Sequence, residues 1–219
     1  MVEIIYQRIL LKLSGEALSA SGQSGIDGTK RREIAEQIHT IVSLGVQCAV
    51  VIGAGNFCRG QVLTQAGVNP IVSDQMGMLA TIMNALALQD ALEKLDVPVV
   101  VHSALPVSGI VHSYHRSAAR RALDQGTVVI CAGGTGNPLV TTDTAATLRA
   151  IELGADVLFK ATQVDGIYDC DPRQFVYAKR YSRLSYDMAI NQGLQVMDQE
   201  AFYQAKRYQL PIRVFNIHQ

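Results

Sequence analysis

The residues with the clearest chemical potential in this chain stand in three glycine-rich segments, each directly after a short apolar run. The segments are Lys12-Leu13-Ser14-Gly15, then Gly53-Ala54-Gly55-Asn56, and finally Gly133 to Asn137. Glycine lets the backbone N–H groups of a turn point at an anion that approaches closely. A helix that begins after the turn adds partial positive charge. One such segment is usually only a tight turn, but three together favour an extended anionic ligand, or two ligands side by side.

Cationic side chains accompany these turns. Lys12 stands near the end of the first apolar run, Arg59 follows the second turn, and Lys160 ends a later apolar run. Phosphoryl transfer needs reactants held in line and cations that stabilise spreading negative charge. Asp143 could hold both lysines in place, or it could cap the helix that follows it. The alternative for the lysines is that they extend to solvent.

Several familiar motifs are absent from the sequence. GxxxxGK[ST] does not occur, which excludes a P-loop NTPase, and the glycines at 53, 55 and 60 are too widely spaced for a dinucleotide-binding fingerprint. His112 and His115 stand three residues apart, but no Cys or Glu completes a metal site around them. No Ser-His-Asp pattern is found either. We therefore expect no metal site built by protein side chains.

A candidate nucleoside site follows Lys160. The stretch from Val164 to Pro172 contains Tyr168 with carboxylates on both sides, including Asp171. An aromatic ring and flanking carboxylates could hold an adenine and its ribose. Because Asp-Gly and Asp-Pro both favour turns, an ordinary turn is the alternative.

The composition is that of a globular protein. Hydrophobic residues make up 48% of the 219 residues and charged residues 17%, while 19 basic side chains balance 19 acidic ones. A general nucleic-acid binder would usually be basic, so this class is disfavoured. The charged residues near the start argue against a signal peptide, and no apolar run approaches the roughly 20 residues of a membrane span. The four cysteines form no CxxC pair, so reduced thiols in a cytoplasm are expected.

Apolar periodicity predicts alternating strands and helices. Strands are expected over 8–14, 47–52, 98–101, 128–131, 157–160 and 211–215, and helices over 29–44, 74–94, 115–123, 143–152, 186–190 and 199–207. Asp74 is expected as an N-cap. The alternation predicts an α/β fold with an open parallel sheet, in which ligands bind beyond the carboxyl ends of the strands. We expect one domain over 1–219.

Six segments carry a family resemblance. They are RILLKLSGEAL (8–18), GAGNFCRG (53–60), DQMGMLATIMNALA (74–87), GTGNPLVTTDTAA (134–146), KATQVDGIYDCDP (160–172) and LPIRVFN (210–216). In this order, and over essentially the whole chain, they resemble the bacterial uridylate kinases of the amino acid kinase superfamily. The resemblance implies an αβα sandwich around a mostly parallel sheet and a homohexamer. It also implies phosphoryl transfer from ATP to UMP with Mg²⁺ in pyrimidine nucleotide biosynthesis, activation by GTP and inhibition by UTP.

The resemblance also implies roles for individual residues. Lys12 and Lys160 would stabilise the transferring phosphoryl group, with Asp143 organising them. The ATP side would be formed by Lys12, Leu13, Ser14, Gly15, Gly55, Arg59, Thr162, Tyr168 and Asp171. The UMP side would be formed by Ala54, Asp74, Thr135, Gly136, Asn137, Pro138, Leu139, Val140, Thr141 and Thr142. Asp74 would take the ribose hydroxyls, and Thr135 and Thr142 would approach the uracil. The GTP response would involve Ala20, Ser21, Gly22, Gln23, Ser24 and Gly25.

The sequence departs from the family pattern in three places. Ala54 replaces the middle one of three glycines that would lie against UMP. Leu139 and Val140 replace two phenylalanines beside the nucleobase. The family continues beyond the position of Gln219 with further strands, so we expect the last strand of this chain to have an open edge.

Two other functions stay open at this stage. One is a kinase of the same superfamily that acts on carbamate or an amino-acid carboxylate, and the other is a non-catalytic nucleotide sensor. Asp74 and the stretch from Gly134 to Asp143 favour a nucleotide acceptor, while the presence of both lysines with Asp143 argues against a non-catalytic protein.

Overall fold

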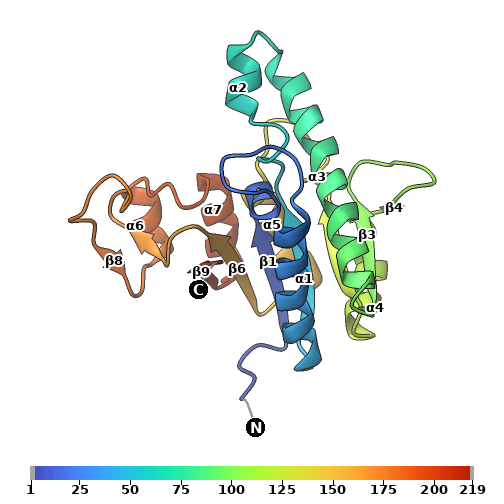
Figure 1. Ribbon diagram of the computed structural model, residues 1–219. Helices are drawn as coiled ribbons and strands as arrows, with labels where there is room; N and C mark the ends of the chain where they lie inside the picture. The colour runs from blue at the N-terminus through green and yellow to red at the C-terminus, as the bar shows by residue number, and fades with distance from the viewer. Residues whose placement is uncertain (1–2, 218–219) are drawn as a thin grey trace.

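A seven-stranded parallel sheet forms the centre of the computed structural model, which describes residues 3–217. The strands lie in the order β4-β3-β5-β2-β1-β6-β9, and all neighbouring pairs are parallel. Their bounds are β1 Arg8–Leu13, β2 Gln47–Ile52, β3 Val99–Ser103, β4 His112–Ser113, β5 Val128–Ala132, β6 Val157–Thr162 and β9 Ile212–Asn216. A small antiparallel pair, β7 (Ile167–Tyr168) and β8 (Arg180–Tyr181), lies beyond β6 (Figure 1).

Helices cover both faces of this sheet (Figure 1). They are α1 Gly28–Ser43, α2 Gly60–Gln65, α3 Pro70–Glu93, α4 Arg116–Asp124, α5 Thr142–Leu153, α6 Tyr186–Asn191 and α7 Gln199–Arg207, with a short 3₁₀ helix, η1, over Gly15–Leu18. Successive residues of β1 point to opposite faces, so Leu11 packs in the core under α1 and α3, while Leu10 packs in the core under α5 and α7. The expected αβα sandwich around a mostly parallel sheet is confirmed.

The parallel arrangement sets the position of the chemistry. Because β1, β2, β5 and β6 all run in one direction, their carboxyl ends meet at one edge of the sheet. The three glycine-rich segments follow β1, β2 and β5 and therefore emerge together at that edge, as the sequence predicts.

The N-terminus of α3 corrects one expectation. Asp74 is not the N-cap: α3 begins at Pro70, and the side chain of Asn69 accepts a hydrogen bond from the Ile71 N–H. Proline is favoured in the first turn because its fixed φ suits a helix and it has no N–H to leave unpaired. Asp74 lies one turn further on, where its carboxylate is available for other contacts. Helix α2 and the short strands β4, β7 and β8 were not predicted from the sequence.

Helix α3 corrects the expectation that no apolar segment approaches the length of a membrane span. By length and composition alone this 24-residue helix could cross a membrane. The core helix of a soluble protein passes the same test, and the side of α3 that carries Ile82, Ala85 and Leu88 is buried in the core between the sheet and α1. The apolar character of α3 therefore has a structural explanation within this domain.

The last described strand, β9, lies at an edge of the sheet and pairs only with β6 among the described residues. An open edge is what we expected for the last strand. Gln219, on which that expectation was based, lies outside the described residues.

Candidate active site

The first two glycine turns pack directly against each other. A Cβ on Gly15 would lie only 2.4 Å from Asn56 Oδ1 and 2.8 Å from the Gly53 carbonyl oxygen. A Cβ on Gly53 would in turn lie 3.5 Å from the hydroxyl of Thr142, at the start of α5. Residue 15 must therefore be glycine for the turn after β1 to approach the turn after β2 this closely.

Two lysines and one aspartate lie where these turns meet. Lys12 on β1 and Lys160 on β6 are direct neighbours in the parallel register, so their side chains emerge on the same face of the sheet. The carboxylate of Asp143 lies between them: Oδ1 is 2.7 Å from Lys12 Nζ, and Oδ2 is 2.5 Å from Lys160 Nζ. All three side chains are at most 14% exposed. The alternative that the lysines extend to solvent is therefore wrong.

The electrostatics of this cluster follow from burial and from the two-to-one excess of cations. Burial acts to raise the pKa of Asp143, but Lys12 and Lys160 together outweigh it and hold the pKa below its usual range. Burial also lowers the pKa of Lys160, and the nearby Lys12 ammonium adds to this, while Asp143 opposes both. The cluster carries one net positive charge when all three groups are ionised, which suits an anionic ligand.

Further contacts fix Lys160 and the start of α5. Lys160 also donates a hydrogen bond to the Val196 carbonyl. Thr141, not Asp143, is the N-cap of α5, and its hydroxyl accepts from the N–H groups of Asp143 and Thr144. The Thr141 hydroxyl itself donates to Asp198. Asp143 is therefore free of a capping role and bridges the lysines.

Arg59 contacts the first glycine turn. Its guanidinium lies 2.6 Å from Glu16 Oε1, on η1, in an ion pair that is largely exposed. Leu13 and Ser14 link β1 to the same turn, and the Leu13 carbonyl accepts a hydrogen bond from Gly53 N–H. The structure thus brings together residues 12–15, Gly55 and Arg59, which the resemblance assigns to the ATP side.

The segment from Thr135 to Thr142 forms the loop after β5 and ends at the first residue of α5. The Thr135 hydroxyl accepts from the Asn137 N–H, and Asp74 Oδ2 accepts from the Leu139 N–H at 2.7 Å. Leu139 is 72% exposed and has a positive φ of 65°. The structure therefore brings Asp74 to the loop that contains Gly136, Pro138, Val140 and the threonines, although Asp74 lies far from them in the sequence.

Strands β7 and β8 and the segment that joins them form the β7–β8 arm, residues 167–181. Tyr168 lies on β7, and Asp171 lies in the turn after it. The Tyr168 hydroxyl bonds to Asp165, and Asp171 accepts from the backbone N–H of Arg173 and pairs with its guanidinium at 3.1 Å. Asp171 chiefly raises the pKa of Arg173, and Glu16 adds a smaller contribution. Thr162, at the end of β6, bonds to Val164, so both carboxylates and this hydroxyl already have local partners.

The segment from Ala20 to Gly25 connects η1 to α1. Its first part is a turn in which Gln23 N–H donates to the Ala20 carbonyl, and Gly22 and Gly25 have positive φ. At its end, Gly25 exchanges hydrogen bonds with Asn56: Gly25 N–H donates to the Asn56 carbonyl, and Asn56 Nδ2 donates to the Gly25 carbonyl. The segment is therefore attached to the second glycine turn.

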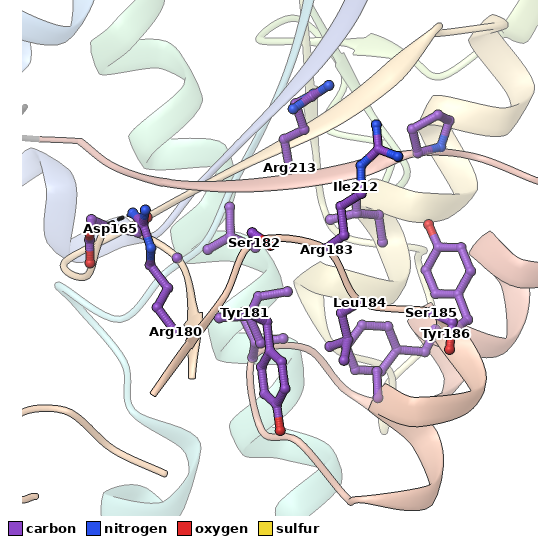
Figure 2. Close-up of a pocket in the computed structure, with 17 residues that line it drawn as sticks. Asp165, Arg180, Tyr181, Ser182, Arg183, Leu184, Ser185, Tyr186, Ile212 and Arg213 are labelled. Atoms are coloured by element: carbon purple, nitrogen blue, oxygen red, sulfur yellow. Dashed lines mark hydrogen bonds and ion pairs between the residues drawn. The ribbon is translucent and has the colours of Figure 1, made fainter. Parts of the chain in front are cut away.

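A cavity of 780 Å³ lies between the β7–β8 arm, α6 and β9, and its lining includes Val196, whose carbonyl accepts a hydrogen bond from Lys160. Figure 2 shows Asp165 and Arg180 joined by an ion pair at one end of it and Tyr186 at the other. None of the residues that line it belongs to the lysine–aspartate cluster or to the glycine turns. The cavity therefore adjoins the cluster on the Lys160 side, while the charged groups themselves lie at the glycine turns.

Sequence analysis missed several side chains that support this site. Asp198 bonds to Thr141 and Thr144. On α3, the Thr81 hydroxyl accepts from Gly133 N–H and Asn84 Nδ2 donates to the Gly53 carbonyl. Polar residues inside an apolar helix were the available signal, since a buried polar group needs a partner.

Comparison with known proteins identifies the family of this chain. The profile of the Amino acid kinase family matches residues 7–216. The chain is 53% identical over 214 residues to a protein of Coxiella burnetii named "Uridylate kinase", covering 98% of this chain and 88% of that one. A "Uridylate kinase" of Legionella pneumophila (strain Corby) is 50% identical over 212 residues, or 97% and 86% of the two chains.

Solved structures support the same family. UMP kinase from Bacillus anthracis superposes with a TM-score of 0.94 at 38% identity, covering 98% of this chain and 88% of that one. UMP kinase from Ureaplasma parvum superposes with a TM-score of 0.93 at 35% identity, covering 99% and 92%. The chain belongs to the amino acid kinase family and is related to its uridylate kinase members.

Proposed function

We propose that this protein transfers the γ-phosphoryl group of ATP to UMP, giving ADP and UDP, in pyrimidine nucleotide biosynthesis. The observation that carries the proposal is the pair of buried lysines bridged by Asp143 at the meeting point of the glycine turns. Two ammonium groups held side by side suit a transition state in which negative charge spreads over the transferring group. The similarity to uridylate kinases supports UMP as the acceptor.

In this proposal ATP and UMP approach the lysines from two sides. The ATP phosphates lie along Lys12 to Gly15, Gly55 and Arg59, and the adenosine lies toward Thr162, Tyr168 and Asp171. UMP lies between Ala54, Asp74 and the loop from Thr135 to Thr142. Asp143 holds both ammonium groups before the substrates bind, so little reorganisation is needed at the moment of transfer.

We infer that Mg²⁺ accompanies ATP. Among residues 3–217 no three His, Cys, Asp or Glu side chains are grouped so that they could hold a metal ion. Asp143 is already paired with two lysines. The nucleotide phosphates and water would therefore supply most of the ligands, which is a common arrangement for Mg²⁺. The ion would neutralise charge on the phosphates, while the lysines act at the transferring group.

The acceptor can be identified by one experiment. ADP release in a coupled assay should require UMP, with carbamate, an amino acid and no acceptor giving no more than background. Dependence on carbamate or an amino acid would instead favour the small-acid kinase, and nucleotide binding without any turnover would favour a sensor. CMP should be a poor acceptor, because a site that hydrogen-bonds one base can reject an analogue by up to about 10⁴-fold. Equal turnover of UMP and CMP would contradict a uracil site at Thr135 and Thr142.

We also propose homohexamer assembly. Four exposed apolar residues recur every three or four positions along α3: Val72, Met76, Leu79 and Met83. An apolar stripe of this kind on a helix is typical of an interaction surface. Light scattering should give the mass of six chains, and Leu79→Arg should lower it, because a charge would then lie in the interface. An unchanged mass for Leu79→Arg would contradict this use of α3.

A cytoplasmic location is proposed for this protein. Regulation by GTP and UTP is proposed from the family resemblance at Ala20 to Gly25. The hydrogen bonds between Gly25 and Asn56 support the proposal, since they connect this segment to a glycine turn of the site. Turnover should rise with millimolar GTP and fall with UTP. Because coupling between two sites is reciprocal, the affinity for GTP should change when UMP is bound. Turnover that is flat over this range would remove the regulatory proposal and leave the catalytic one.

A further inference from the structure

Two buried asparagines form a hydrogen-bonded pair under the first two glycine turns. Asn56, in the second glycine turn, is 3% exposed, and Asn84, on α3, is fully buried. Each amide donates to the other: Asn56 Nδ2 to Asn84 Oδ1 at 2.9 Å, and Asn84 Nδ2 to Asn56 Oδ1 at 2.8 Å. A buried amide is costly without partners, so a fully paired one fixes its surroundings.

The remaining amide hydrogens are also paired, both to backbone. Asn84 Nδ2 donates to the Gly53 carbonyl at 2.8 Å, and Asn56 Nδ2 donates to the Gly25 carbonyl at 2.8 Å. All four N–H bonds of the two amides are therefore used, which is the full donor capacity of these side chains. Reversing either amide would place oxygen against oxygen, so only one arrangement satisfies the network.

The asparagine pair positions the first glycine turn through the two oxygens to which Asn84 Nδ2 donates. Those oxygens, Asn56 Oδ1 and the Gly53 carbonyl, are two of the three atoms that a Cβ on Gly15 would meet. Asn84 thus fixes the surface on which Gly15 rests, although it lies on a different element. Lys12 precedes this turn by three residues on β1.

A second polar side chain on α3 holds the other substrate loop. The Thr81 hydroxyl, three residues before Asn84 and buried with it, accepts from the Gly133 N–H at 2.8 Å. Residues three apart on a helix lie on the same face. One face of α3 therefore bonds to the turn after β2 through Asn84 and to the turn after β5 through Thr81. Because different side chains hold the two turns, each turn can be perturbed by its own substitution.

We propose that Asn84, through its amide pair with Asn56, is a positioning residue for phosphoryl transfer that holds the Gly53–Gly55 turn against Gly15. Asn84 does not contact the substrates. It keeps the backbone of the two turns at the spacing that the ATP phosphates need, relative to Lys12 and Lys160. The inference deepens the proposed kinase function and rests on it for the identity of the substrates.

Asn84→Asp is the sharpest variant, because it keeps size and shape but removes both donors. A misplacement of about 1 Å in a site of this kind can cost roughly 10²-fold. We expect turnover at saturating ATP and UMP to fall at least about tenfold, which is a larger change than the rise in KM for UMP that follows from Ala54 lying in the same turn. Asn84→Ala, which adds no charge, should give the same pattern if Asn84→Asp fails to fold.

Two control variants on α3 separate positioning from lost stability. Leu88→Ala opens a cavity in the same core and should lower the melting temperature, yet keep turnover per folded molecule. Thr81→Val removes the bond to Gly133 and should raise KM for UMP more than it lowers turnover. The inference is overturned if Asn84→Asp keeps turnover within about twofold of wild type, a change of about 0.4 kcal/mol. A matching loss in folded Leu88→Ala would also overturn it.

Hydrogen exchange gives a readout that does not depend on the substrates. Amides of 13–16 and 53–56 should exchange faster in Asn84→Asp than in wild type, and Leu88→Ala should not reproduce this local increase. If the wild-type protein does not phosphorylate UMP, the proposed function fails, and this comparison alone decides the inference. If the amides of both turns exchange at the same rate in Asn84→Asp and in Leu88→Ala, the positioning role of Asn84 is overturned.

Discussion

The lysine–aspartate cluster and the Thr135–Thr142 loop lie at the same edge of the sheet but are built differently. Lys12 is 7% exposed and comes from a central strand, while Leu139 is 72% exposed and stands in a loop with a positive φ. The cluster is fixed by sheet register and two ion pairs. The loop is attached through single hydrogen bonds from Leu139 N–H to Asp74 and from the Thr141 hydroxyl to Asp198.

This difference suggests a division of labour. Groups that stabilise a transition state gain most from being preorganised, so they belong on rigid elements. Groups that recognise an acceptor must let it enter and leave, so they belong on loops. Changes in the cluster should therefore act mainly on turnover, and changes in the loop mainly on UMP affinity.

Lys12→Ala should have the largest effect. Its ammonium group should interact more strongly with the transition state than with either bound substrate. We expect turnover to fall at least about 10²–10³-fold, while UMP affinity changes less than about threefold. Lys12→Arg should rescue poorly, because a planar guanidinium does not replace a compact ammonium group. Circular dichroism must first show that the variant is folded. A folded Lys12→Ala that keeps more than about a tenth of wild-type turnover would place Lys12 outside the chemistry.

Asp74→Asn tests the acceptor side. The carboxylate accepts from Leu139 N–H, and in the proposed complex it also accepts from the ribose hydroxyls. A hydrogen bond to a charged group contributes about 1.5–3 kcal/mol, so UMP affinity should fall roughly 10–150-fold. ATP affinity, measured by calorimetry, should stay unchanged. If UMP affinity is also unchanged, Asp74 only anchors the loop.

The pH dependence of turnover tests the cluster again. Burial and Lys12 lower the pKa of Lys160 below the ordinary value of 10.5. The ammonium group of Lys160 should therefore lose its proton at a lower pH than that of a typical lysine. Turnover should therefore decline in alkaline solution with an apparent pKa below 10.5. Asp143→Asn should move this decline to lower pH, because Asp143 raises the pKa of Lys160.

Stability should respond to pH in a different way. The lowered pKa of Lys160 means that the unfolded chain binds this proton more tightly, so its contribution to the unfolding free energy rises as pH rises between the folded and unfolded pKa values. The pKa of Asp143 is also lowered, and its contribution is present above the unfolded pKa and lost as pH falls through the folded one. Thermal unfolding followed against pH should show both trends. An alkaline loss of turnover and stability together would instead indicate general unfolding.

Ala54→Gly should have the smallest effect. Ala54 is not among the described residues with positive φ, so its backbone does not require glycine. Restoring the family residue should change UMP affinity less than about threefold, below 1 kcal/mol. Ala54→Val is the matched control and should weaken UMP binding more, because a branched side chain there would crowd the acceptor. A large gain for Ala54→Gly would show that the Ala54 methyl group obstructs UMP.

Sequence reasoning predicted the elements of the cluster better than the supports around it. Lys12, Asp143 and Lys160 could be found because each stands at a strand end or helix start, where spacing and glycine are informative. The N-terminus of α3 was misplaced because Asp74 has the chemistry of a cap, whereas Asn69 and Pro70 provide the actual start.

Long-range partners could not be read from spacing. Asn84 meets Gly53 and Asn56 across 31 and 28 positions, and Asp198 meets Thr144 across 54. In the sequence Asn84 is one polar residue in an apolar helix, and nothing local says which turn it contacts. The β7–β8 arm was equally hidden, since its two strands are only two residues long.

The most direct test of the account is a crystal structure with ADP, UMP and a metal-fluoride mimic of the transferring phosphoryl group. The account predicts that the mimic lies between the two nucleotides, with Lys12 Nζ and Lys160 Nζ each about 2.7–3.2 Å from it. ADP should follow the Gly15 turn, and UMP should lie against Asp74. A mimic that contacts neither ammonium group, or nucleotides bound instead in the cavity beside Tyr181 and Tyr186, would contradict the central claim.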